Sequence, residues 1–280
     1  LTAAALEPIA SNDPAGYVAY AIMLAFLVGA FQLSLGLLRM GVLVDFLSHP
    51  VVTGFTNAAA IIIATSQLSK LFGVSVASQE HHYQTIMNVL SESLINTHTP
   101  TLLMGLLAIF IILFVRKISS KYPAVLISVV ITTFISWYIK FETNYEGKVI
   151  GVVPDGLPSM QLPQIDFEQL INLGTVAIAI SLIGFMEAIS IAKAMATQTK
   201  QRLDADQELI GQGLSNLAAS IFQGYPVSGS FSRSAVNISA GAVTGFSCVV
   251  TGIVVGITLL FLTPLLYHLP QATLAAVIIT

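Results

Sequence analysis

The sequence predicts an all-α protein that crosses a lipid bilayer several times. Of its 280 residues, 55% are hydrophobic and only 9% are charged, whereas soluble domains average about 25% charged residues. So few charges cannot cover a surface that faces water on all sides. Apolar runs also recur along the chain, many of them close to the roughly 20 residues with which a helix spans hydrocarbon. We therefore expect a multi-pass integral membrane protein in contact with the lipid bilayer.

The apolar runs locate the candidate membrane spans. Polar or proline-containing stretches separate them, and we expect spans at 17–38, 51–68, 101–115, 122–139, 174–196, 208–222 and 245–267. The segment QEHHYQTIMNVLSESLINTHTP is too polar to span and predicts an amphipathic surface helix. Residues 141–170 contain three prolines and predict an extended loop.

The basic residues predict how the spans are oriented. Cytoplasmic loops carry an excess of Lys and Arg, and counting on alternate sides of the predicted spans gives seven against three. The larger group is Arg39, Arg116, Lys117, Lys121, Lys193, Lys200 and Arg202, and the smaller group is Lys70, Lys140 and Lys148. We expect the larger group in the cytoplasm and the 141–170 loop outside. Arg233 belongs to neither group because it lies in a segment at membrane level.

The composition also argues against several functions. A net charge of −3, from 11 basic and 14 acidic residues, gives no electrostatic footprint for nucleic acid. A single cysteine, Cys248, rules out an intramolecular disulfide and a Cys-rich metal site. Because no Ser/His/Asp set is evident, we expect no enzyme, no catalytic residue, no metal site and no cofactor.

The segment GYPVSGSFSRSAVN at 224–237 breaks the pattern of long helices. Pro226 and Gly229 interrupt helical structure, and such backbone is tolerated at membrane depth only where protein buries it or where it lines a cavity. SFSRSAVN then predicts a new helix, with Ser230 as its N-cap. A helix that begins within the membrane directs unpaired N–H groups and a positive dipole end inward, where anions bind. Arg233 adds a positive charge to the first turn, so this geometry favours an anion.

Glu187 is a second charge inside an apolar span. An intramembrane carboxylate costs about 2.5 kcal/mol or more, so it normally faces a partner or a water-filled cavity. Two interpretations are open at this point. Glu187 and Arg233 pair and fasten two helices together, or both line an anion pocket in which Glu187 gains and loses a proton.

Four stretches of this sequence resemble the sulfate permease (SulP) family of anion transporters. They are LLRMGVLVDFLSHPVVTGFTNAAAIIIATSQL at 37–68, GVVPDGLPSMQLP at 151–163, GFMEAISIAKAMA at 184–196 and ELIGQGLSNLAASIFQGYPVSGSFSRSAVNISAGAVTG at 208–245. The last of these is the most specific. The resemblance implies a seven-plus-seven inverted-repeat fold with core and gate domains, in which two discontinuous half-helices point their N-termini at a central site.

The resemblance also implies which part of that fold this chain forms. As part of a sulfate transporter transmembrane domain, residues 1–10 match the tail of the third helix and 17–139 match the fourth to seventh helices. Residues 140–173 match an extracellular loop, and 174–280 match the eighth helix to the start of the twelfth. We expect the first helices, the last helices and the cytoplasmic STAS domain to be absent from this chain. A homodimer of the full-length protein, located in the plasma membrane, is a further expectation.

Carried over by position, the resemblance places the anion at five consecutive residues: Ser230, Phe231, Ser232, Arg233 and Ser234. In having a glutamate at position 187, this sequence resembles the proton-coupled sulfate transporters of the family more than its chloride exchangers. We therefore expect secondary active transport of sulfate by proton symport. Transport of bicarbonate, a dicarboxylate or another anion by the same fold stays open, as does an anion-dependent channel or motor-like membrane protein.

Overall fold

The computed structural model describes Thr2, Leu6 and residues 14–42, 49–76, 79, 82–119, 122–153, 156–163 and 167–280. These residues are helical apart from turns and connecting segments, and their only β-type pairing is an isolated antiparallel bridge between Val149 and Pro270. The chain divides into two compact units, each assembled from two separate stretches. Unit 1 comprises 1–56 and 158–247, and unit 2 comprises 57–157 and 248–280.

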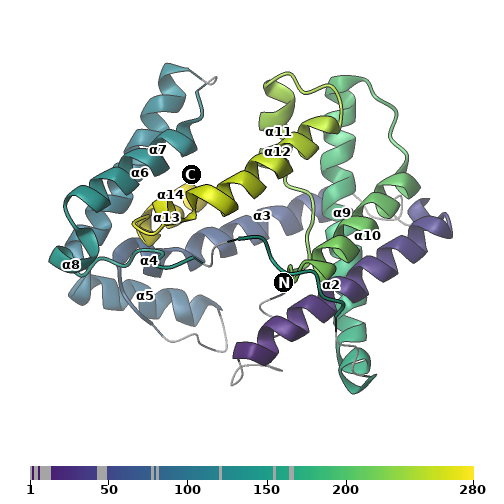
Figure 1. The fold of residues 1–280 in the computed structure, drawn as a ribbon, viewed down its shortest axis with the longest axis horizontal. Coiled ribbons are helices and arrows are strands. Elements are labelled where there is room, and N and C mark those ends of the chain that lie inside the picture. The colour runs from purple at the N-terminus through teal and green to yellow at the C-terminus, as the bar shows by residue number, and fades with distance from the viewer. Residues whose placement is uncertain are drawn as a thin grey trace. The chain divides into compact units, whose positions relative to one another are not determined.

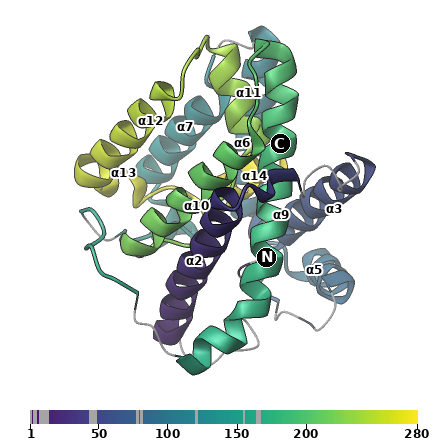
Figure 2. The same cartoon turned by 90° about the vertical axis from the view of Figure 1, so that its right-hand side faces the viewer.

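Unit 1 is built around three long helices: α2 (Pro14–Leu37), α9 (Phe167–Thr199) and α10 (Ala205–Ile221). Helices α2 and α10 lie side by side in both views, and α9 packs against α2 (Figures 1 and 2). Glycines allow this close approach, because a Cβ added to Gly213 would lie 2.5 Å from the Leu33 nitrogen. The short helix α11 (Phe231–Ser239) contacts α9.

Two apolar clusters fix the rotation of α9 within unit 1. Leu173 packs with Leu24 and Val28 of α2, and further along the helix Phe185 and Ile189 pack with Leu209 of α10. All of these side chains are buried, and helices within a membrane associate through close van der Waals packing of this kind rather than through removal of apolar surface from water. Because Phe185 and Ile189 flank Glu187 in sequence, this packing also sets the direction in which that carboxylate leaves the helix.

Unit 2 contains the other helices, except that α3 (His49–Ser66) begins in unit 1. In chain order they are α4 (Leu68–Phe72), α5 (His82–Asn96), α6 (Thr99–Ile118), α7 (Ala124–Tyr138), α8 (Phe141–Tyr145), α12 (Phe246–Ile257, whose first two residues belong to unit 1), the π-helical turn η2 (Thr258–Leu262), α13 (Thr263–Leu266) and α14 (Gln271–Ile279). Helix α14 packs against α4, α6 and α7 (Figure 1). Met104, Phe141 and Val149 form a buried cluster in this unit.

Each predicted span coincides with helical structure. Among the described residues, four helical segments are long and apolar enough to cross a membrane: Gly16–Leu37, Thr99–Ile118, Leu170–Thr197 and Phe246–Leu266. The predicted span at 122–139 forms α7, which is apolar but shorter. The span at 208–222 forms α10, which has the polar side chains Gln212 and Asn216 among its residues. The predicted surface helix is α5, in which Val89 is the buried residue.

Two predicted segments differ from the structure. The predicted span at 51–68 divides at Gln67, whose N–H bonds to the Ala64 oxygen at 3.1 Å, three residues back, and this tight turn separates α3 from α4. The predicted loop at 141–170, or 140–173, is shorter, because α8 forms at one end and α9 begins at Phe167, four residues after the last proline of the loop. Within the predicted helix tail at 1–10, the described residues are Thr2 and Leu6, and both are helical. The other residues of this tail lie outside the described part of the chain.

Candidate functional site

Helix α11 is a half-helix, as the sequence predicts. Its nine residues rise about 13 Å at 1.5 Å per residue, less than half of the roughly 30 Å of hydrocarbon in a bilayer. The extended residue Ser230 (φ −136°, ψ 119°) precedes it, and the Ser234 N–H bonds to the Ser230 oxygen at 3.0 Å. Ser230 is therefore the N-cap residue, but its side chain makes no capping hydrogen bond. The first N–H groups of α11 are thus not satisfied by that hydroxyl.

The chain leading into α11 is held by one buried side chain. Asn216 of α10 is 0% exposed, and its side-chain amide makes two hydrogen bonds to the backbone of Val227. Its Oδ1 accepts from the Val227 N–H at 2.8 Å, and its Nδ2 donates to the Val227 oxygen at 3.1 Å. An extended segment interrupted by Pro226 cannot satisfy these groups within itself, so Asn216 takes the place of a neighbouring strand.

A second buried amide extends this arrangement to the other long helices. Gln32 of α2 is 1% exposed. Its Oε1 accepts a hydrogen bond from Asn216 Nδ2 at 3.0 Å. Its Nε2 donates to the Ser181 backbone oxygen of α9 at 3.1 Å. The same Nε2 lies 3.4 Å from Gln212 Oε1. Polar groups buried in an apolar interior are costly unless they are paired. This pairing joins α2, α9, α10 and the segment before α11 into one hydrogen-bonded set, which we call the amide network (Gln32, Ser181, Gln212, Asn216 and Val227).

The segment before α11 also packs directly on α9 beside Glu187. The Ser228 hydroxyl donates to the Gly184 oxygen at 3.1 Å, and a Cβ added to Gly229 would lie 3.3 Å from Ala188 Cα. Gly184 and Ala188 are four residues apart on one face of α9, and Glu187 is three residues beyond Gly184, so all three lie near the same face. Glu187 is half-buried there. The half-helix and the half-buried Glu187 carboxylate are therefore parts of one region.

The structure describes the exposure of the predicted site residues other than Ser232, whose side chain lies outside the described part. Arg233 is exposed, Phe231 is 56% exposed and Ser234 is half-buried. Glu187 and Arg233 are both among the described residues of unit 1, and within that part of the chain no ion pair joins them. This structure therefore provides no support for a helix-fastening ion pair. Arg233 and the first turn of α11 together present positive charge without an anionic partner from the described chain.

The sequence profile of the sulfate permease family matches residues 1–280. The chain belongs to the sulfate permease family. Among curated relatives it is 35% identical to "Sulfate transporter 4.1, chloroplastic" of Arabidopsis thaliana over 288 residues, covering 100% of this chain and 41% of that protein. It is 33% identical to "Sodium-independent sulfate anion transporter" of Bos taurus, covering 93% of this chain and 48% of that protein. The chain thus spans less than half the length of these relatives.

Solved structures confirm the helical transmembrane fold of this sulfate permease chain. The transmembrane domain of a cyanobacterium bicarbonate transporter, BicA, matches with a TM-score of 0.85 and 26% identity over 99% of this chain and 71% of that one. The structure of SLC26A9 matches with a TM-score of 0.86 and 25% identity over 95% of this chain and 43% of that one. The matched family is described as the sulfate permease family, and both named relatives are sulfate transporters.

Sequence reasoning found α11, Arg233 and Glu187 but missed the amide network. The sequence contains an indication of this network, because Gln32 and Asn216 have amide side chains within the otherwise apolar runs FQLSLGLL and LSNLAAS. Polar residues inside a membrane span need hydrogen-bonding partners, as a carboxylate such as Glu187 does. For metals, the described residues contain no group of three or more His, Cys, Asp or Glu side chains arranged to hold an ion.

Proposed function

We propose that this chain is the central part of a proton-coupled sulfate transporter. The observation that carries the proposal is the half-helix α11, which follows an extended segment clamped by Asn216 and has Arg233 in its first turn. The relatives named as sulfate transporters favour sulfate as the substrate. We assign unit 1 to the core domain and unit 2 to the gate domain of an inverted-repeat transporter, and we assign no enzymatic activity.

Sulfate recognition follows from the groups at this helix start. Backbone N–H groups of residues 231–233, the Ser232 hydroxyl and the Arg233 guanidinium are donors suited to an oxyanion, and Ser230 and Ser234 flank them. A guanidinium presents two parallel N–H groups to two oxygens of sulfate, whereas an ammonium acts as a point charge. The dipole of α11 adds roughly half a positive charge. The site therefore selects a compact, negatively charged oxyanion.

Charge balance assigns the proton to Glu187. Sulfate brings two negative charges to a site that offers Arg233 and roughly half a charge from the helix dipole. An ionised Glu187 close by leaves the loaded site strongly negative, so sulfate binding draws a proton onto this carboxyl. By linkage, the proton strengthens sulfate binding by the same factor. The loaded site then changes from facing one side of the membrane to facing the other with most of its charge neutralised.

Other anions are the second candidate. The match to a bicarbonate transporter favours this alternative, because a helix start and an arginine select negative charge more readily than chemical identity. A dicarboxylate carrier and an anion-dependent channel or motor-like protein are also distinguishable from sulfate symport by assay. We place the full-length protein in the plasma membrane as a homodimer, although one relative is named as chloroplastic.

The deciding experiment is uptake of radiolabelled sulfate by the full-length protein in proteoliposomes, with and without an inward proton gradient. We expect accumulation that requires the gradient and that excess unlabelled sulfate competes more strongly than bicarbonate or dicarboxylates. Equal sulfate uptake with and without the proton gradient refutes proton coupling. Stronger competition by bicarbonate or a dicarboxylate moves the substrate to that class, and anion currents without coupled uptake identify a channel.

A further inference from the structure

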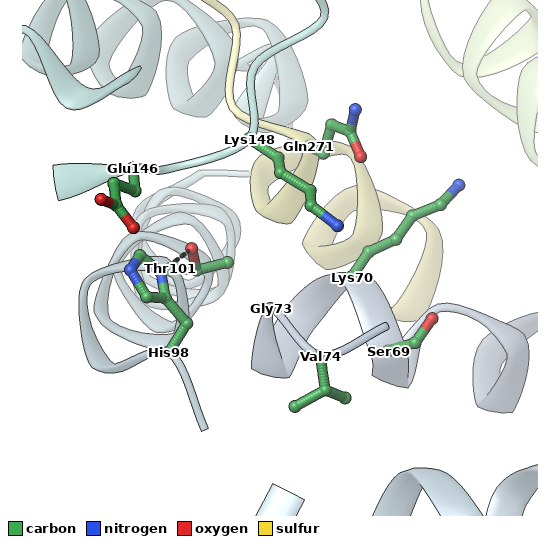
Figure 3. Close-up of a pocket in the computed structure, with 9 residues that line it drawn as sticks. All are labelled: Ser69, Lys70, Gly73, Val74, His98, Thr101, Glu146, Lys148 and Gln271. Atoms are coloured by element: carbon green, nitrogen blue, oxygen red, sulfur yellow. Dashed lines mark hydrogen bonds between the residues drawn. The ribbon is translucent and has the colours of Figure 1, made fainter. Parts of the chain in front are cut away.

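Unit 2 contains a polar pocket that the half-helix mechanism does not use (Figure 3). It lies where the end of α4, the start of α6, the segment after α8 and the start of α14 meet, and its volume is about 130 Å³. One enclosed water needs only about 10–15 Å³ by the same measure, so the pocket has room for a polyatomic ion. Six of its lining residues carry the chemistry: Lys70, His98, Thr101, Glu146, Lys148 and Gln271.

The pocket has an excess of positive charge. Lys70 and Lys148 line it together with one carboxylate, Glu146, which leaves a formal charge of +1 when His98 is neutral. Lys148 Nζ donates to Ser75 Oγ at 2.8 Å, which holds its ammonium group in place. Within the described residues Lys70 has no hydrogen bond or ion pair. Figure 3 shows the Lys70 side chain on the side of Gln271 with its ammonium group directed away from Glu146 and His98, so the carboxylate does not pair with Lys70.

The backbone around these side chains is rigidly connected. The Gln271 N–H bonds to the Lys148 oxygen at 3.0 Å, and the Ile150 N–H bonds to the Leu269 oxygen at 2.9 Å, so Lys148 lies on a strip of chain tied to the start of α14. On the opposite wall, the His98 N–H bonds to the Phe72 oxygen at 3.0 Å. Gly73, at φ 72°, allows this approach, because a Cβ there would lie 2.7 Å from His98 Cβ.

Further hydrogen-bonding groups border the pocket. His98 Nδ1 and Thr101 Oγ1 are 2.6 Å apart at the first turn of α6, and this contact fixes the orientation of the imidazole. The starts of α6 and α14 both reach the pocket wall, and helix starts favour negative charge. Together with the two lysines that line the pocket, the oriented imidazole and the two helix starts favour an anionic ligand.

We propose that this pocket binds a sulfate or phosphate group, either as a free ion or as the phosphate of a lipid headgroup. In the orientation predicted from the basic residues, three of them face outward, and Lys70 and Lys148 are two of these three. The pocket is then a second anion site, on the outer side of unit 2. It holds an anion near the outer surface of the protein without contributing to the half-helix site.

The free-ion form is tested by sulfate and inorganic phosphate binding to the full-length protein in nanodiscs of phosphatidylcholine alone. Binding is measured for the Arg233→Ala protein, so that the half-helix site does not contribute. We expect saturable binding that weakens at least about fivefold, the effect of losing one partly exposed charge contact of roughly 1 kcal/mol, on Lys70→Gln or Lys148→Gln. The control Lys140→Gln changes an exposed lysine outside this pocket and should leave binding unchanged.

The lipid form is tested by native mass spectrometry of the same proteins after reconstitution with phosphatidylglycerol. If a headgroup phosphate occupies the pocket, the double variant Lys70→Gln/Lys148→Gln retains fewer lipids than Lys140→Gln, and phosphatidylglycerol competes with sulfate in the first assay. Equal anion binding and equal lipid retention by the double variant and Lys140→Gln overturn the proposal. Sulfate uptake by a Lys140→Gln protein that retains Arg233 is measured in parallel, so that a failure of the half-helix mechanism is recognised separately.

Discussion

Replacing Asn216 by leucine tests whether the amide network holds the half-helix in position. Leucine is close to asparagine in shape, so the change removes hydrogen bonds while creating little new space. It leaves three groups without their partner: the N–H and oxygen of Val227, 2.8 and 3.1 Å from the amide, and Gln32 Oε1, 3.0 Å away. An unsatisfied buried polar group costs roughly 1–3 kcal/mol. At the low end of that range, the three together destabilise the fold by about 3 kcal/mol.

The measurement is the apparent melting temperature of the full-length protein in detergent, followed by sulfate uptake in proteoliposomes. A loss of about 3 kcal/mol lowers the melting temperature of a large domain by roughly 5 °C or more. Sulfate uptake should fall further than the loss of stability alone explains. Val227 is four residues before the start of α11, so loss of its hydrogen bonds also displaces the half-helix that we propose binds sulfate. The matched control is Ser215→Ala, the adjacent exposed position, whose hydroxyl bonds only to the Gly211 oxygen of its own helix. If Asn216→Leu melts and transports like Ser215→Ala, the network does not position α11.

Three further predictions concern unit 1. Arg233→Ala should abolish sulfate binding and Arg233→Lys should weaken it about tenfold or more, measured by equilibrium binding; wild-type affinity in Arg233→Ala would assign this residue a structural role. Glu187→Gln should still exchange sulfate for sulfate but lose accumulation driven by a proton gradient, because it mimics the protonated carboxyl permanently; undiminished accumulation would place coupling elsewhere. Gly213→Ala should destabilise the protein by about 1–3 kcal/mol, since its Cβ would meet the Leu33 backbone at 2.5 Å, whereas Gly211→Ala, with no atom within 4 Å, should be neutral or stabilising; equal melting temperatures would refute the close packing of α2 on α10.

The helices of this protein were predictable from the sequence because hydropathy and helix-breaking residues act locally. Apolar runs located most spans to within a few residues, and Pro226 with Gly229 identified the interruption before α11. Glu187, within an apolar span, and Arg233, in the interrupted segment, were conspicuous for the same reason. Where local signals were weak, boundaries were wrong: the tight turn at Gln67 has neither proline nor glycine, and α9 extends back to Phe167 through residues that are only moderately apolar.

The partners of buried polar groups were decided by tertiary structure alone. Asn216 and Gln32 are 184 residues apart in sequence, and they meet because glycines let α2 and α10 approach closely. The pocket of unit 2 likewise joins Lys70, Lys148 and Gln271, which come from three distant segments. The sequence determined which segments enter the membrane and which of them carry charge, since each residue's transfer free energy is its own property. Which donor meets which acceptor depended on packing between helices, because that is set by the shapes of surfaces distant in the chain.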